Sequence, residues 1–530
     1  MRSISLAVFA VLALAASAHA AEVPADLVLR NGDILTQDAA HPHAHSVATR
    51  GGFIIALDDV DKLIGPKTRV VDLHGRAVVP SLTDAHAHLA GLGFAAAMVD
   101  LRACTSADDC VARAAGKKPT RGDWTLGRGW DQNRFPDAKF PTHVPLDKVA
   151  GPAWFERVDG HAGWANAAAM RRAKITRDTR DPAGGKIVRD DKGEPTGVFV
   201  DNAMSLVERA IPEPTAAETE AALLRAQALV LAEGLTEIHD MGIGHDTQAA
   251  YEKLVADGRL QLRVYAMGAQ SEAERLFAHP PVHARPGALF TLRGIKLYAD
   301  GALGSRGAAL LAPYSDDPQN RGLEITPEPV LEKLARGAVA AGWQVAVHAI
   351  GDRGNRNVLD AYTAAGVGPA QRFRIEHAQV VALDDIPRFA KLGVIASMQP
   401  THATSDSPWA EKRVGPERIK GAYAWRKMLS AGVRLAFGSD FPVEEPSVVA
   451  GFRAAVERGG WTPGERLTLD ETLRAFTTGA AYAAFEEAWR GRAAPGMAAD
   501  LTVFDRGAAD LVHARADLTV VAGRVVYERH

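Results

Sequence analysis

Short apolar runs recur through the middle of this chain and alternate with segments of helical pattern. The first run, residues 77–79, leads into His86 and His88, and seven more follow at 235–239, 261–267, 294–298, 344–350, 374–377, 394–398 and 434–439. Apolar positions at helical spacing mark segments between most of them, at 215–232, 247–257, 327–341, 353–365, 383–392 and 422–431. This alternation predicts an α/β protein with a (β/α)8 TIM-like barrel. The alternative, a doubly wound open sheet, would need neither a closing strand nor a terminal β unit.

Both ends of the chain have a different pattern, with short strand-like runs and turns. Residues 27–30 and 34–37 flank Asn31-Gly32, and further runs follow at 46–50, 53–57 and 70–72. The same pattern of short strand-like runs returns at 500–504 and 518–527. We predict a small antiparallel β unit, joined into one β-sandwich domain from residues 21–80 and 490–530. The barrel would then occupy residues 81–489.

One interval is far longer than a single crossover. It runs from about residue 91 to 211, between the first and second barrel strands, and is rich in Trp, Pro, Gly and charged residues. Loops after barrel strands form the active-site face. We therefore predict an insertion that overhangs the mouth of the barrel and shapes the substrate pocket.

The first twenty residues resemble a secretory signal peptide. Arg2 provides a positive start, residues 6–16 are apolar, and Ala18-His19-Ala20 is a cleavage signal. We expect cleavage after Ala20 and a periplasmic or secreted protein. No later stretch is long and apolar enough to span a bilayer.

Composition narrows the class of protein further. The chain has 530 residues, 47% of them hydrophobic, and a formal net charge of −3 without any block of like charges. This favours a small-molecule substrate over nucleic acid or an anionic membrane surface, and it is compatible with a homo-oligomer. The two cysteines, Cys104 and Cys110, are too few for a thiolate metal cluster. An exported protein could join them, and the sequence leaves this pairing open.

The histidine pair after the first apolar run is the first candidate for chemistry. Residues two apart on a strand share a face, so the imidazoles of His86 and His88 can point at one site. Neutral imidazole is a common ligand of zinc and similar metals. An alternative is that both histidines simply lie on the surface after a core strand.

The ends of the other predicted strands provide further metal-compatible groups, namely His348, His377 and Asp440, while Lys296 lies within a strand. A lysine in a buried apolar strand is costly unless it is paired or neutralised. It could form a salt bridge with Asp300 or Asp240. It could also carry a carbamate, which bridges two metals as a carboxylate does. The sequence leaves both alternatives open.

The ordered set His-x-His, Lys, His, His, Asp resembles the amidohydrolase superfamily in its two-metal form with a carboxylated lysine. Longer stretches resemble the N-substituted formamide deformylase-like branch. They are GRGWDQNRF (127–135), DGHAGWANAAAM (159–170), GGKIVRDDKGEPTG (184–197), KLYADGALGSR (296–306), VHAIGD (347–352), IEHAQ (375–379), MQPT (398–401) and GSDFPV (438–443). The resemblance covers nearly the whole mature chain.

The resemblance implies a role for each residue of this set. His86, His88 and Asp440 would bind one divalent metal, His348 and His377 a second, with carboxylated Lys296 between them; zinc is the expected metal, and a single ion is the alternative. Asp440 would act as the general base in hydrolysis of an amide, formamide or N-acyl C–N bond. His161 resembles a position that can reach the substrate, with a structural hydrogen bond as the alternative. His402, by its place just past the seventh strand, would face the barrel mouth and contact the substrate. The alternatives are an esterase, lactonase or deaminase on the same site, or a metal-binding protein without turnover.

Overall fold

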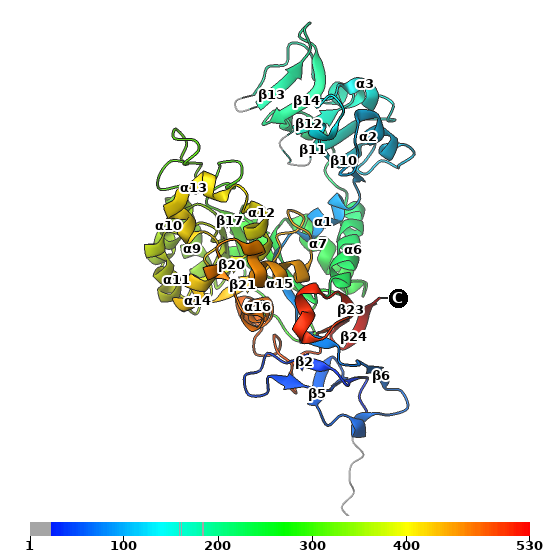
Figure 1. The fold of residues 1–530 in the computed structure, drawn as a ribbon, viewed down its shortest axis with the longest axis vertical. Helices are drawn as coiled ribbons and strands as arrows, with labels where there is room; N and C mark the ends of the chain where they lie inside the picture. The colour runs from blue at the N-terminus through cyan, green and yellow to red at the C-terminus, as the bar shows by residue number, and fades with distance from the viewer. Residues whose placement is uncertain (1–22, 158–159, 161, 183–184, 530) are drawn as a thin grey trace, which may run out of the picture.

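The computed structural model describes residues 23–157, 160, 162–182 and 185–529. The predicted signal peptide and His161 lie outside the described residues. Within the described part of the chain, no helix is long and apolar enough to cross a membrane. Figure 1 shows the terminal strands at one end of the molecule, the barrel in the middle and the insertion at the other end.

The centre of the molecule is a sheet of eight parallel strands in the order β21-β20-β19-β18-β17-β16-β15-β8. The strands are β8 (Thr83–Ala87), β15 (Glu237–Ile243), β16 (Arg263–Ala269), β17 (Phe290–Tyr298), β18 (Gln344–Ala349), β19 (Arg374–His377), β20 (Ile395–Met398) and β21 (Leu435–Phe437). The backbone N–H of Asp440 donates to the carbonyl of His86 at 2.8 Å, and that of His88 to the carbonyl of Phe441 at 3.0 Å. These bonds join β8 to the segment after β21 and close the barrel, so the predicted fold class is confirmed.

Helices follow most barrel strands, as the periodicity predicts. They include α6 (Ala216–Ala232), α7 (His245–Ala256), α9 (Glu328–Ala341), α10 (Asp352–Ala364), α11 (Ile386–Leu392), α14 (Trp425–Ser430) and α15 (Val448–Glu457). Two further helices, α16 (Leu469–Phe476) and α17 (Thr478–Ala483), precede the final strands. Thr215 and Glu218 form a capping box at the start of α6, which explains why the helix begins there.

Strands from both ends of the chain pair in one sheet. Its order is β24-β23-β22-β7-β2-β3, in which β24 (Arg524–Glu528), β23 (Ala516–Val521) and β22 (Leu501–Phe504) join β7 (Ala77–Pro80), β2 (Asp33–Leu35) and β3 (His43–Ala44). A second sheet contains β5 (Phe53–Leu57), β4 (Val47–Arg50), β1 (Leu27–Arg30) and β6 (Arg69–Asp72). Apolar residues from both ends, such as Leu29, Val78 and Val503, share one core.

Two details of the predicted β unit were wrong. It is not wholly antiparallel, because β1 pairs with β6, and β2 with β7, in parallel. Asn31-Gly32 does not close a hairpin either, since β1 and β2 lie in different sheets. Asn31 has φ of 58° and turns the chain from one sheet into the other. A turn signal indicates a change of direction but not which strands will pair.

The apolar run before the two histidines is also divided differently from the prediction. Residues 77–79 belong to β7 in the terminal sheet, whereas the histidines follow on β8 in the barrel. Ser81 separates the two strands with φ of 52°, a left-handed conformation that ends a regular strand.

The insertion has its own six-stranded sheet, in the order β13-β14-β12-β11-β10-β9. Its strands are β9 (Val99–Asp100), β10 (Thr125–Trp130), β11 (Ala153–Arg157), β12 (Ala162–Ala165), β13 (Gly185–Arg189) and β14 (Pro195–Asp201). The helices α2 (Ala107–Ala114), α3 (His143–Leu146), α4 (Ala167–Arg172) and α5 (Ser205–Glu208) accompany it. Trp130 and Trp164 are fully buried in a core separate from that of the barrel. A disulfide joins Cys104 and Cys110, which resolves the pairing left open by the sequence.

The helix directly after the two histidines, α1 (Leu89–Ala95), packs against α6 through Gly93. A Cβ atom at Gly93 would lie 1.9 Å from the carbonyl oxygen of Ala222, so even alanine would force the helices apart. We expect Gly93→Ala to cost about 1–3 kcal/mol and lower the midpoint of urea unfolding. Gly287→Ala is the control, because Gly287 has nothing within 4 Å of the added atom. Equal midpoints for both variants would contradict this packing.

Candidate active site

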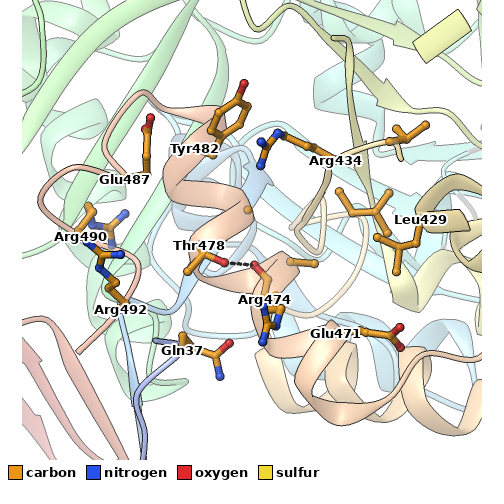
Figure 2. Close-up of a pocket in the computed structure, with 14 residues that line it drawn as sticks. Gln37, Leu429, Arg434, Glu471, Arg474, Thr478, Tyr482, Glu487, Arg490 and Arg492 are labelled. Carbon is orange, nitrogen blue, oxygen red and sulfur yellow. Dashed lines mark hydrogen bonds between the residues drawn. The ribbon is translucent and has the colours of Figure 1, made fainter. Parts of the chain in front are cut away.

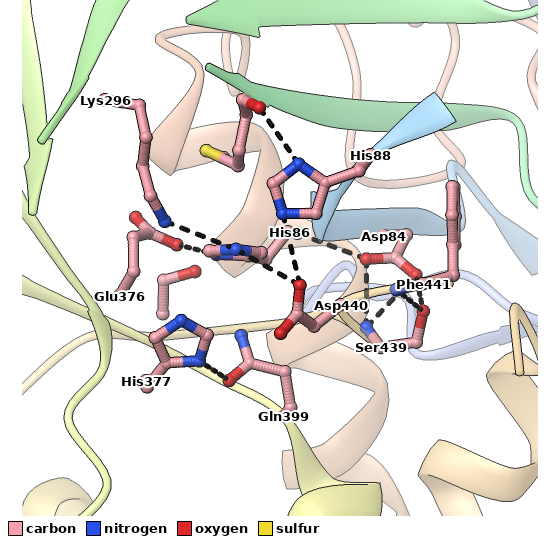
Figure 3. Close-up of polar contacts among 12 residues, drawn as sticks. Asp84, His86, His88, Lys296, Glu376, His377, Gln399, Ser439, Asp440 and Phe441 are labelled. Atoms are coloured by element: carbon pink, nitrogen blue, oxygen red, sulfur yellow. Dashed lines mark hydrogen bonds and ion pairs between the residues drawn. The ribbon is translucent and has the colours of Figure 1, made fainter. Parts of the chain in front are cut away.

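Six side chains predicted from the sequence meet at the carboxyl-terminal ends of the barrel strands. They are His86, His88, Lys296, His348, His377 and Asp440. Asp440 Oδ1 lies 3.5 Å from His86 Nε2 and 3.3 Å from His88 Nε2, and Lys296 Nζ lies 3.4 Å from His86 Nε2 (Figure 3). The ring centroid of His377 is 4.7 Å from that of His86 and 4.6 Å from that of His348. The structure therefore brings imidazole, amine and carboxylate groups from five strands into one site.

Asp84 holds Asp440 in position through its neighbour in sequence, Ser439. Its buried carboxylate accepts hydrogen bonds from the backbone N–H of Ser439 at 3.0 Å, from the Ser439 hydroxyl at 2.6 Å and from the backbone N–H of His86 at 3.1 Å. Gly438 is required beside it, since a Cβ there would lie 2.4 Å from Asp84 Oδ1. This contact holds the ends of β8 and β21 together, and with them the first and last residues of the site.

Two residues of the site have left-handed backbone conformations. His377 has φ of 71° and Asp440 has φ of 62°. Such conformations cost of order 1–3 kcal/mol for residues other than glycine and are concentrated at functional sites. At His377 the turn lets an imidazole face the barrel interior directly after Glu376, although neighbouring residues of a regular strand point to opposite faces.

Hydrogen bonds fix the ring nitrogens of the histidines on β8. His86 Nδ1 lies 2.5 Å from the carboxylate of Glu376, and His88 Nδ1 lies 3.0 Å from the carbonyl oxygen of Met241. Both partners are acceptors, so the proton is on Nδ1 in each neutral ring. The lone pair on Nε2 is then directed towards Asp440.

The other two histidines are held in the same manner. His377 Nδ1 donates to the amide oxygen of Gln399 at 2.8 Å, which leaves the Nε2 lone pair free. His348 Nε2 lies 3.4 Å from the carbonyl oxygen of Gly301, which leaves its Nδ1. Ligating histidines in metal sites typically donate their second N–H to such an acceptor. The donor set and its hydrogen bonds thus fit a divalent metal.

The pKa values of the two charged groups are both lowered, for different reasons. Burial alone would raise the pKa of Asp440, but His86, His88 and His402 outweigh it and hold the value at about 2. Burial lowers the pKa of Lys296 to about 8, although Glu376 and Asp440 act against this shift. Asp440 is therefore ionised at neutral pH, and Lys296 loses its proton more easily than an exposed lysine.

The salt bridges considered for Lys296 are not formed. Asp300 instead accepts backbone N–H groups from Ala309, Ile350 and Gly351, at 2.8–2.9 Å. Asp240 accepts from the Tyr251 hydroxyl and the backbone of Leu89. Within the described chain, neither carboxylate lies within ion-pair distance of the Lys296 amine. Both aspartates hold loops at the barrel mouth.

His402 lies beside the six converging side chains. Its Nε2 is 3.8 Å from Asp440 Oδ2, and its ring stacks on His377 with centroids 5.9 Å apart. Two groupings could hold a metal ion among the described residues, namely His86 with His88 and Asp440, and His377 with His402 and Asp440. His161, the other predicted substrate contact, is outside the described residues.

Sequence reasoning missed the side chains that orient the histidines, above all Glu376, Arg374 and Gln399. Glu376 accepts from Arg374 Nε at 2.7 Å, and both side chains are completely buried. A signal was present, because an arginine and a glutamate two residues apart in an apolar strand must share one face. Gln399 had no comparable signal, since it follows the end of a strand.

Comparisons with known proteins agree with this fold and site. A barrel with histidine and carboxylate groups at its carboxyl end defines a class of metal-dependent hydrolases. The model of the amidohydrolase family matches residues 69–527. The chain therefore belongs to the amidohydrolase family, as its motifs predicted.

The similarity to known proteins extends over almost the whole chain. The protein LONG AFTER FAR-RED 3 of Arabidopsis thaliana is 34% identical, covering 96% of this chain and 92% of its own length. The putative amidohydrolase YtcJ of Bacillus subtilis is 33% identical over 88% of this chain and 92% of its own length. The N-substituted formamide deformylase of Arthrobacter pascens is 28% identical over 95% and 98%, respectively.

A solved structure is similar to that of this protein over most of the chain. An uncharacterized metal-dependent hydrolase from Pyrococcus furiosus has a TM-score of 0.79 and 29% sequence identity, covering 91% of this chain and 99% of its own.

Proposed function

We propose that this protein is a metal-dependent amidohydrolase that cleaves a C–N bond of a small molecule, in an amide, formamide or N-acyl group. The observation that carries the proposal is the convergence of four histidines, Lys296 and Asp440 at one end of the barrel. Each of His86, His88 and His377 has its Nδ1 bound to an acceptor, so its Nε2 is available to a metal. The similarity to an N-substituted formamide deformylase supports this choice of bond.

We assign the metal ligands by their grouping. One divalent ion, expected to be zinc, would be held by His86, His88 and Asp440. These three residues form one of the two groupings whose ligand atoms lie close enough together to bind a metal. His348 and His377, whose ring centroids are 4.6 Å apart, would hold the second. Lys296 would lie between them as a carbamate. The grouping of His377, His402 and Asp440 supports a one-metal alternative.

Formation of the carbamate requires an amine without its proton. Burial lowers the pKa of Lys296 to about 8, so a fraction of the amine is neutral near pH 7. The neutral nitrogen attacks carbon dioxide, forms an N–C bond and releases one proton, which leaves a monoanionic carbamate. The absence of a carboxylate partner at Asp240 or Asp300 supports this role over a salt bridge.

Asp440 has the properties required of the proton carrier. A divalent metal at such a site polarises a carbonyl group and lowers the pKa of water from 15.7 to about 7. Asp440 is ionised at neutral pH, because its own pKa is about 2. It can take the proton of the attacking water and deliver it to the leaving amine. We assign His402, next to Asp440, and His161 to substrate binding.

Two alternative functions would use the same active-site side chains. An esterase, lactonase or deaminase would need the same ionised carboxylate and metal ligands, so the site alone does not select the substrate. A metal-binding protein without turnover would have no need of a base next to the metal ligands. Asp440, within 3.5 Å of both His86 and His88, would serve as a ligand in either case, so measured turnover separates the two functions.

We also propose that the mature protein begins near Ala21 and works in the periplasm or outside the cell. Disulfides persist in oxidising compartments and are rare in the cytosol. The bond between Cys104 and Cys110 supports export. The geometry is equally compatible with a monomer or a homo-oligomer.

The proposed activity predicts dependence on a divalent metal. Chelation should abolish hydrolysis of a panel of N-formyl and N-acyl amines, and zinc, cobalt or manganese should restore it. The measurement is amine release together with metal content per chain. Hydrolysis confined to esters or lactones would support the alternative enzyme. Full activity without metal would refute the proposal.

Substitution of Lys296 tests whether this residue carries a carbamate or remains a plain amine. We expect Lys296→Ala to lose metal and activity together, because the bridging anion is removed. Short carboxylic acids should restore part of both, since a free carboxylate can occupy the vacated place. A variant that keeps its metal and does not respond to carboxylates would exclude the carbamate.

The role of Asp440 predicts a different result. Asp440→Asn keeps an oxygen that can bind a metal but loses the ability to accept a proton. We expect kcat to fall by about 10² to 10⁴ while most of the metal remains. Metal content and kcat should be measured on the same preparation. Near wild-type turnover in a fully loaded variant would remove Asp440 from proton transfer.

A further inference from the structure

A cavity of about 440 Å³ opens at the amino-terminal end of the barrel, opposite to the candidate active site. Leu435, the first residue of β21, lines its floor, whereas Asp440 follows the other end of that strand. Helices α16 and α17 form one wall, and the segment from Glu487 to Arg492 forms another (Figure 2). The volume lies in the range of small-molecule pockets, about 300–1,000 Å³.

The two carboxylates that line the cavity are already neutralised by arginines outside it. Glu487 accepts two hydrogen bonds from Arg372, at 2.6 and 2.8 Å. Glu471 accepts two from Arg426, at 2.6 and 2.7 Å. Neither Arg372 nor Arg426 is among the lining residues. These acids therefore compensate the arginines of the cavity only in part, with Arg434 acting on Glu487 at longer range.

Two of the lining arginines form no ion pair with the part of the chain that the structure describes. The guanidinium of Arg434 lies over the ring of Tyr482, with Cζ 4.1 Å from the centroid, which leaves its N–H groups at the edge free to donate. Arg492 is exposed and forms no ion pair or hydrogen bond with any side chain in the described ranges. A third, Arg474, pairs only with exposed Asp470, an interaction of little strength in water. The cavity thus carries net positive charge.

Buried polar atoms in the cavity wall also lack partners. Gln37 Oε1 and Arg490 Nε are inaccessible and make no hydrogen bond to the described chain. Arg490 is 1% exposed, and its Nε lies 3.5 Å from Asp500, within ion-pair distance. Buried polar groups without partners are uncommon in folded proteins. These two atoms lie behind the surface of the cavity, so the groups that can meet a bound molecule are the accessible guanidiniums.

The rest of the lining is apolar, with Leu429, Val433, Leu435 and Ala475 on one side. An inorganic anion would leave this surface unused, and a neutral apolar molecule would leave the guanidinium groups unused. We propose that the cavity binds a small organic anion, whose carboxylate pairs with Arg434 in the positive field to which Arg492 contributes, and whose apolar body lies against these side chains. The proposal is independent of the metal site.

Titration calorimetry of the metal-loaded full-length protein tests the proposal with benzoate as the probe. We expect saturable binding of benzoate, and at least 10-fold weaker binding of benzyl alcohol, which has a similar shape but no charge. Equal affinities would show that apolar contact alone is responsible and would overturn the proposal. An absence of saturable benzoate binding would do the same.

Variants locate the binding. The Arg434→Gln, Arg492→Gln double variant should bind benzoate at least 10-fold more weakly. The Arg515→Gln, Arg524→Gln double variant loses the same charge at exposed positions that do not line the cavity, and should bind as the wild type does. Unchanged affinity in the first double variant would place benzoate elsewhere, for instance at the metal centre. Arg492→Glu, at an exposed position, provides a second test if the double variant does not fold.

Discussion

Charge compensation inside the barrel is the constraint on which the rest of the structure depends. A chain of buried polar side chains extends from the active site to the opposite end of the barrel. It consists of Glu376, Arg374, His239, Glu237 and Arg490. Arg374 donates to Glu376 at 2.7 Å and to His239 Nδ1 at 2.8 Å, and His239 Nε2 lies 3.3 Å from Glu237. Glu237 pairs in turn with Arg490 at 2.5 Å. Removing one of its charged members would leave a buried charge unpaired, a loss that typically costs 3–5 kcal/mol.

This series of buried polar side chains links the two ends of the barrel. At the carboxyl end, Glu376 orients the imidazole of His86. At the amino end, Asp500 accepts from Arg263 at 2.8 Å and lies 3.5 Å from Arg490. Asp500 directly precedes β22 of the terminal sheet, so a buried ion pair attaches that sheet to the barrel. The sheet built from both chain ends is therefore part of the support of the barrel, and the ligand geometry depends on residues far from it.

Periodicity predicted much of the fold and the positions of several candidate site residues, whereas their chemical roles came from the resemblance to the amidohydrolase superfamily. Eight alternating runs placed His348, His377 and Asp440 at strand ends, because strand alternation and barrel topology are local consequences of the sequence. Sheet pairing in the terminal unit was not predictable in this way, since β1 and β2 lie in different sheets despite their turn signal. The orienting residues were missed for a related reason. Glu376 reaches His86 over 290 positions of sequence, a contact that no local pattern contains.

Lys296 is compensated only at longer range, by the nearby charges of Glu376 and Asp440. Its amine is buried without a carboxylate partner among the described residues and lies 3.4 Å from an imidazole nitrogen that Glu376 has oriented towards the same site. An ammonium group and a divalent cation held by the same site would repel each other, since even unit charges about 4 Å apart interact by about 4 kcal/mol at an effective dielectric of 20. Metal binding and loss of the lysine proton must therefore favour each other. Conversion of the amine into an anion goes further, because it replaces repulsion with attraction. The unpaired lysine is thus what the proposed metal centre requires.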